Sequence, residues 1–210
     1  MLSTYYTVKN EEKNQIIIQK SRFIGYVKRV ESEEAAQTFI QQTKKKHHDA
    51  NHNCSAYMIG ENNQIQKASD DGEPSGTAGV PMLEVLKKRD LKDTVIVVTR
   101  YFGGIKLGAG GLIRAYGSAA SRAIEAAGVV ERRLMTGFSV TVDYPMLGKL
   151  ENELRNSHHI LESINYLEKV EFYVFVRDGV EEDFLDWITN LTSDTALVAK
   201  KGSAYVEIDV

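Results

Sequence analysis

The segment that most constrains the fold is a strand, a glycine-rich turn and a long helix in immediate succession. Val95–Val98 is a continuous apolar run, typical of a strand that is central in its sheet or covered on both faces. Six of the 16 glycines then fall between residues 103 and 117. A stripe of small and apolar residues, closed by Gly128 as a C-terminal cap, predicts a helix over about 107–127. The small residues of that stripe predict close packing of the helix on the sheet.

The rest of the first half alternates strand and helix patterns with their own end signals. Two apolar strands are joined by a tight turn around Lys20–Arg22, and Ser32 is placed to cap the next helix. Lys44–His48 closes that helix with positive charge, and Pro81 suits the first turn of a second helix. The predicted segments are strands at 15–19 and 23–27, a helix from 33 to about 48, strands at 54–59 and 64–67, and a helix after 81.

The second half has the pattern of a smaller unit with the element order βαββαβ. Phe138, Val140 and Val142 alternate with polar residues, which predicts a half-buried strand. The predicted segments are strands at 138–142, 160–166 and 170–176, one or two closing strands over 195–210, and helices at about 147–154 and 184–191. This order predicts a ferredoxin-like split βαβ fold. The sequence therefore predicts an α+β protein with domains at 1–133 and 134–210.

Composition limits the class of protein further. The 210 residues are 42% apolar and 26% charged, which is ordinary for a globular protein, and no apolar run approaches the length of a membrane span. The N-terminus lacks the pattern of a secretory signal, and a single cysteine excludes an internal disulfide. We therefore expect a cytoplasmic protein without a membrane partner, in which Cys54 is a packed residue rather than a nucleophile.

Charge is divided unequally along the chain. Residues 1–133 contain 20 basic and 15 acidic side chains, whereas residues 134–210 contain 6 basic and 14 acidic ones. The basic excess of the first part favours a polyanionic partner such as RNA or the ribosome. The acidic second part is a candidate surface for a protein partner.

The glycine-rich segment matches neither of the familiar phosphate-binding motifs. It lacks the Gly-x4-Gly-Lys-Ser/Thr pattern of a P-loop, and its glycines do not have the G-x-G-x-x-G spacing. A strand that ends at Arg100, and a loop that opens a long helix, still place backbone N–H groups and the helix dipole where an anion could bind.

Basic and aromatic side chains within this segment could contact phosphate and stack on bases. The candidate nucleic-acid or anion-binding residues are Arg100, Tyr101, Phe102, Gly103, Gly104, Lys106, Gly108, Gly110, Gly111 and Arg114. On residue chemistry alone, a tight turn with core aromatics and solvated arginines is an equally good interpretation.

An acidic loop precedes this segment. Asp70, Asp71 and Glu73 are carboxylates close together in sequence, a composition compatible with a hard cation such as Mg²⁺ or with acid–base chemistry. Their spacing is not that of an EF-hand, and carboxylates in such turns often cap backbone N–H groups. We favour that structural role, or a salt bridge to Arg100 or Arg114, over a metal site. The sequence requires no cofactor.

The histidines do not complete a metal-binding motif. His47, His48 and His52, with Asp49, have the composition of metal ligands but neither H-E-x-x-H spacing nor paired cysteines beside them. We interpret them first as groups that compensate a helix dipole. Phosphate contacts together with Lys44–Lys46 are the second interpretation, and zinc binding is the third. No catalytic serine arrangement can be named.

Taken together, the motifs resemble the YigZ/IMPACT family of small cytoplasmic proteins. The matching residues are His52-Asn-Cys54, Asp70-Asp-Gly-Glu-Pro-Ser-Gly-Thr-Ala78, Arg100-Tyr-Phe-Gly-Gly104 and Lys106-Leu-Gly-x-Gly-Gly-Leu-x-Arg-Ala-Tyr116. The match covers about residues 1–130. Residues 134–210 resemble the extra C-terminal domain of bacterial members of the YigZ/YvyE type.

The resemblance implies an N-terminal domain of the ribosomal protein S5 domain 2-like type and a C-terminal domain similar to the last domain of elongation factor G. It carries over no catalytic residues. Eukaryotic relatives regulate translation with an additional N-terminal domain, so their partner is not transferred. We expect a non-enzymatic RNA- or ribosome-associated protein with a role in regulation of translation, in which Arg100, Lys106 and Arg114 contact phosphate. The alternative is a metal-dependent hydrolase or phosphoryl-handling enzyme that uses the Asp70–Glu73 loop.

Overall fold

The chain forms two compact units, each with its own sheet and core. The computed structural model describes residues 2–210. The first unit contains Tyr5–Glu131 and Ile208–Val210, and the second contains Leu2–Thr4 and Arg132–Glu207. The expectation of a two-domain α+β protein is confirmed. The exchange of short terminal segments between the units was not predicted, because no local pattern marks it.

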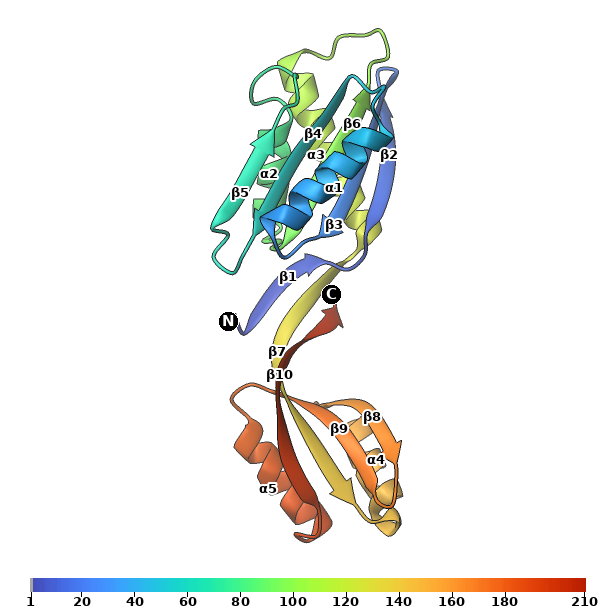
Figure 1. Cartoon of the computed structure of the whole chain (residues 1–210), viewed down its shortest axis with the longest axis vertical. Coiled ribbons are helices and arrows are strands. Elements are labelled where there is room, and N and C mark those ends of the chain that lie inside the picture. Colours follow the sequence, from blue (N-terminus) through green and yellow to red (C-terminus); the bar gives the residue numbers. More distant parts are fainter. Residues whose placement is uncertain (1) are drawn as a thin grey trace. The chain divides into compact units, whose positions relative to one another are not determined.

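A five-stranded antiparallel sheet forms the centre of the first unit (Figure 1). In spatial order its strands are β2 (Glu12–Ile18), β3 (Ser21–Arg29), β6 (Thr94–Tyr101), β4 (His52–Ile59) and β5 (Ile65–Ser69). The apolar run Val95–Val98 lies in β6, the central strand, and all four side chains are fully buried. Its lack of polar alternation follows from this position, since helices cover both faces of the sheet.

Helix α1 (Glu33–Lys46) lies on one face of this sheet, and α2 (Gly79–Lys88) and α3 (Gly108–Ala127) lie on the other (Figure 1). The small residues of α3 allow close packing, as predicted. A Cβ at Gly25 of β3 would lie 2.8 Å from the carbonyl oxygen of Ala119. Glycine is therefore required where the helix crosses this strand.

The ends of α1 follow their sequence signals. The backbone N–H of Ala35 donates to Oγ of Ser32 at 3.2 Å, so Ser32 is the N-cap. Acidic residues occupy the first turn and Lys44–Lys46 the last, and His47 is the C-cap. This charge arrangement complements the helix dipole.

The second unit has the predicted βαββαβ order. Its elements are β7 (Val129–Val142), the 3-10 turn η1 (Tyr144–Met146), α4 (Leu147–Asn156), β8 (Ile160–Tyr166), β9 (Val170–Arg177), α5 (Glu181–Thr192) and β10 (Leu197–Asp209). The strands lie in the order β8-β9-β7-β10, which is the ferredoxin-like arrangement, and a single strand closes the fold. β7 also pairs with β1 (Thr4–Val8), a strand that was not predicted from the sequence. Of the helices within residues 2–210, none combines the length and apolar character needed to cross a membrane.

Candidate nucleic-acid interface

The end of strand β6 places neighbouring side chains on opposite faces of the sheet. Arg100 lies opposite Phe23 and His52 in the strand register, whereas Tyr101 lies opposite Arg22. Side chains alternate along a strand, so Arg100 is on the α3 face and Tyr101 on the α1 face. Both residues were candidate RNA contacts, yet they belong to two different surfaces.

Arg100 is a buried member of an ion-pair network. Its side chain is 7% exposed, and Nη1 donates to Oε1 of Glu73 at 2.7 Å. The hydroxyl of Tyr116 donates to the same carboxylate oxygen at 2.7 Å. The guanidinium lies 5.4 Å from the ring centroid of Phe23 and 5.5 Å from that of Phe102. Arg100 therefore anchors the acidic loop to the sheet, and a phosphate could reach it only if this pair opened.

Asp70 caps the start of α2 from a distance. Its carboxylate accepts hydrogen bonds from the backbone N–H groups of Gly76, Ala78 and Gly79 at 2.8, 3.0 and 2.8 Å. Burial opposes ionisation, but the three N–H donors outweigh it and hold the pKa of Asp70 below its usual range. The carboxylate thus supplies acceptors that the first turn of the helix lacks.

The other two acidic residues of the loop bind different partners. Asp71 accepts from Nζ of Lys44 and from the backbone N–H of Asn53, both at 2.6 Å, while Glu73 binds Arg100. The three carboxylates therefore diverge. Within residues 2–210, no group of three or more His, Cys, Asp or Glu side chains is placed to hold a metal ion. Each carboxylate is bound to protein donors here, so this geometry gives no support to the metal interpretation of Asp70, Asp71 and Glu73.

Replacing Asp70 with asparagine should lower the free energy of unfolding and make it less sensitive to acid pH. The native pKa lies below the unfolded value, so the contribution is present above the unfolded pKa and is lost as pH falls through the folded pKa. We expect a loss of about 1–2 kcal/mol at pH 7 and a smaller loss at an acid pH below the folded pKa of Asp70. Urea unfolding at both pH values measures this. Asp178→Asn, at an exposed carboxylate, should change neither the stability nor its dependence on pH. Equal effects of the two variants would contradict the capping role of Asp70.

Cys54, His47 and His52 are hydrogen-bonded within the fold. Cys54 is buried, its thiol donates to the carbonyl of Asp70 at 2.9 Å, and burial raises its pKa to about 12. This geometry confirms the packed interpretation of Cys54. His52 donates through Nδ1 to the carbonyl of Asp71 at 2.9 Å. His47 lies between the hydroxyls of Tyr26 and Tyr101, at 2.7 and 2.8 Å, and burial lowers its pKa.

The glycine-rich loop exposes its backbone. Gly103 packs so closely on the β2–β3 turn that a Cβ would lie 2.0 Å from the carbonyl carbon of Lys20. Gly104 and Gly108 have φ values of 86° and 69°, and the space where a Cβ would stand is open at both; this backbone conformation favours glycine. Gly110 and Gly111 belong to the first turn of α3, which has no side-chain cap and no acidic residue. The N–H groups at this helix end are therefore open to an anion.

The acidic loop and the glycine-rich loop meet at one pocket of about 300 Å³. Its lining residues are Glu73, Pro74, Arg100, Phe102, Lys106, Leu107, Gly108, Ala109 and Leu112. Lys106 is exposed, and Phe102 is about half exposed. Arg114 is also exposed, one turn further along α3. The sequence-predicted candidates Phe102, Lys106 and Arg114 are thus accessible, unlike Arg100.

The opposite face of the sheet carries a second cluster, which joins the sequence candidates Tyr101, Lys46 and His47 to three residues that were not predicted. The Arg22 guanidinium lies 4.3 Å from the ring centroid of Tyr101, and Nζ of Lys46 lies 5.2 Å from that of Tyr26. We call this cluster the basic-aromatic patch; its residues are Lys13, Arg22, Tyr26, Lys46, His47 and Tyr101. Lys13 pairs with Tyr26 in the β2–β3 register. The residues come from β2, β3, β6 and the C-terminal end of α1. Only the alternation within the β2–β3 hairpin could have indicated Lys13, Arg22 and Tyr26.

One acidic residue borders the basic-aromatic patch. Tyr101 donates to Oδ1 of Asp49 at 3.0 Å. Because Tyr101 is thereby a donor to Asp49, Nδ1 of His47 donates to the tyrosine oxygen and Nε2 accepts from Tyr26. These bonds hold both tyrosine rings in place on the sheet surface.

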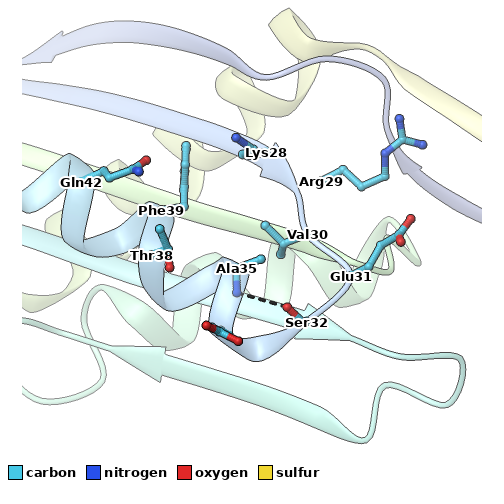
Figure 2. Close-up of a pocket in the computed structure, with 10 residues that line it drawn as sticks. Lys28, Arg29, Val30, Glu31, Ser32, Ala35, Thr38, Phe39 and Gln42 are labelled. Carbon is cyan, nitrogen blue, oxygen red and sulfur yellow. Dashed lines mark hydrogen bonds between the residues drawn. The ribbon is translucent and has the colours of Figure 1, made fainter.

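A larger depression lies at the start of α1 (Figure 2). Its volume is about 560 Å³, and Figure 2 shows Ser32 in the capping bond to Ala35. Lys28 pairs with Glu11 at 2.7 Å and lies near the ring of Phe39. Ser32 and Lys28, two polar residues that line this depression, are thus already bonded to other protein groups. We therefore assign no function to it.

Comparison with known proteins agrees with the two-unit architecture. Residues 19–124 match the Impact N-terminal domain, and residues 140–195 match a domain of unknown function, DUF1949. A solved structure, described as the crystal structure of a hypothetical protein, has a TM-score of 0.61 and 28% identity. The similarity covers 94% of this chain and 97% of that one.

Two curated bacterial proteins are also similar. IMPACT family member YvyE of Bacillus subtilis (strain 168) is 57% identical over 207 residues, which cover 99% of this chain and 95% of that protein. IMPACT family member YigZ of Escherichia coli (strain K12) is 36% identical over 151 residues, covering 68% of this chain and 74% of that protein. With a family model matched to its first unit and a relative aligned along nearly its whole length, the chain belongs to the IMPACT family.

Proposed function

We propose that the protein is a non-enzymatic, RNA- or ribosome-associated cytoplasmic protein with a role in regulation of translation. The observation that carries the RNA part is the basic-aromatic patch, where Arg22 and Lys46 lie against the rings of Tyr101 and Tyr26. Cations beside aromatic faces are the groups that bind phosphates and stack on bases of single-stranded RNA. The role in translation rests on the family resemblance rather than on geometry.

Exposed cations on the other side of the sheet extend the proposed RNA contact. Lys106 and Arg114 are exposed beside the open N-terminus of α3. A phosphate there would meet two cations and backbone N–H groups, with no acidic residue in the first helical turn. Arg100 has a positioning role in this proposal, since its guanidinium holds the loop through Glu73.

The enzyme alternative gains no support from these contacts. Its three loop carboxylates are bound to backbone donors, Lys44 and Arg100. The Cys54 thiol is buried, with its pKa raised to about 12, so it is not a nucleophile near neutral pH. A binding function would use the exposed cations Lys106 and Arg114. A hydrolase would need the loop carboxylates, which are already bonded to other protein groups.

The double variant Lys106→Ala/Arg114→Ala should weaken RNA binding by about tenfold or more. It should also reduce the slope of log affinity against log salt by about 2, since each lost phosphate contact removes about one unit. Fluorescence anisotropy with a short unstructured RNA, repeated over a salt series, measures both quantities.

Arg122→Ala is the matched control for this double variant. Arg122 is an exposed cation on the same helix but pairs with Glu125 at 3.1 Å. We expect its affinity and salt slope to equal those of the wild type. Equal affinities for wild type and double variant, at matched stability, would overturn the assignment of Lys106 and Arg114.

A further inference from the structure

A second pocket, unrelated to the proposed RNA surface, lies in the second unit beside α4 and α5. Its volume is about 560 Å³. The lining residues are Glu153, Asn156, Ser157, His158, His159, Val180, Asp183, Phe184 and Trp187. None of them takes part in the function proposed above, so the chemistry of this pocket needs its own explanation.

Aromatic rings form one side of the pocket. The ring centroid of His159 lies 4.9 Å from that of Phe184 and 5.6 Å from that of Trp187. The ring of His158 is tilted by 44° against that of His159, with the centroids 4.0 Å apart. Phe184 is buried in the core, while Trp187 is only partly covered. The core residue thus holds the cluster in place and leaves ring surface available to a ligand.

The charge of the pocket is negative. Glu153 and Asp183 are exposed, and neither forms a hydrogen bond or ion pair with another side chain in the described part of the chain. No lysine or arginine is among the lining residues. Burial, followed by the nearby charge of His158, lowers the pKa of His159 to about 4. That ring is therefore neutral at pH 7, and its buried Nδ1 has no hydrogen-bond partner within residues 2–210.

Aromatic faces beside unpaired carboxylates fit a flat organic cation. A guanidinium stacks on aromatic rings, donates paired hydrogen bonds to carboxylates and accepts none. An anion would be repelled by Glu153 and Asp183. A metal ion finds no group of three suitable ligands in the described structure. We propose that this pocket binds an arginine side chain from a basic segment of a partner protein.

The surrounding unit suits such a partner. Residues 134–210 contain 14 acidic and 6 basic side chains, and an excess of one sign steers an oppositely charged segment and speeds its association. The pocket supplies the specific contact for one arginine, and the acidic unit supplies longer-range attraction for its neighbours.

Trp187 gives a direct test, because it is the only tryptophan in the chain. The intact protein is titrated with a blocked peptide of alternating arginine and glycine while tryptophan fluorescence is recorded. We expect a saturable change. The same peptide with citrulline, the uncharged analogue of arginine, should bind about tenfold more weakly or not at all. A lysine peptide should also bind more weakly, since it cannot stack or donate in pairs.

The variant Asp183→Asn should weaken binding of the arginine peptide by about tenfold. Asp186→Asn removes the same charge from the same helix, at an exposed residue that does not line the pocket, and should leave binding near wild type. Circular dichroism confirms that each variant is folded. The proposal is overturned if citrulline or lysine peptides bind as well as arginine, if Asp183→Asn has no effect, or if both variants weaken binding equally.

Discussion

The variant Glu73→Ala should lower the free energy of unfolding by about 3–5 kcal/mol, the loss expected when one partner of a buried ion pair is removed. The Glu73 side chain is 3% exposed and accepts from both Arg100 and Tyr116 at 2.7 Å. Without it, the Arg100 guanidinium remains buried with its charge uncompensated, and the tyrosine hydroxyl loses its acceptor. Guanidinium chloride unfolding, followed by circular dichroism, measures the loss.

Two further variants separate the buried pair from ordinary surface pairs. Glu84→Ala removes an exposed pair with Lys87 at 3.2 Å and should cost less than about 1 kcal/mol. Combining Glu73→Ala with Arg100→Met should recover part of the loss, because the buried charge is then gone. A loss below about 1 kcal/mol for Glu73→Ala alone, the range of a surface pair, would contradict the view that this network anchors the loop.

The second large effect is expected at Gly103. A Cβ there would lie 2.0 Å from the carbonyl carbon of Lys20, 2.1 Å from its oxygen and 2.4 Å from the nitrogen of Ser21. These are backbone atoms, so no side chain can rotate away, and the loop or the β2–β3 turn must move. We expect Gly103→Ala to cost about 3 kcal/mol, measured by the same unfolding experiment.

Gly117 provides the control for that substitution. It lies within α3, and nothing is within 4 Å of a Cβ built there. Gly117→Ala should therefore stabilise the protein by about 0.5–1 kcal/mol, the usual helix preference for alanine. If both alanine variants changed stability in the same direction, the close approach at Gly103 would not be the cause.

Much of the fold could be predicted because local signals agreed with one another. Ser32 and Lys44–Lys46 marked both ends of α1, and Val95–Val98 marked the central strand. β1 and the exchange of terminal segments were missed, because their pairing depends on partners far along the chain. The residues of these segments do not by themselves indicate such distant partners.

The candidate site was harder to predict than the fold. The residue types near the glycine-rich loop indicated an anion, but they did not indicate that Arg100 is used internally by Glu73. That contact joins residues 27 positions apart in sequence. In the basic-aromatic patch, Tyr101 was a candidate but Arg22 was not, since the two become neighbours only through the pairing of β3 with β6.

Ultraviolet crosslinking of the protein to RNA, with the crosslinked peptides located by mass spectrometry, tests the central claim most directly. Bases stacked on aromatic rings are the groups expected to crosslink to them. We expect crosslinks at Tyr26, Tyr101 or Phe102. The crosslink at Tyr101 should be reduced when Arg22 is replaced with alanine, which removes the cation 4.3 Å from the Tyr101 ring. Crosslinks confined to residues 132–207, or none at low salt, would contradict the central claim.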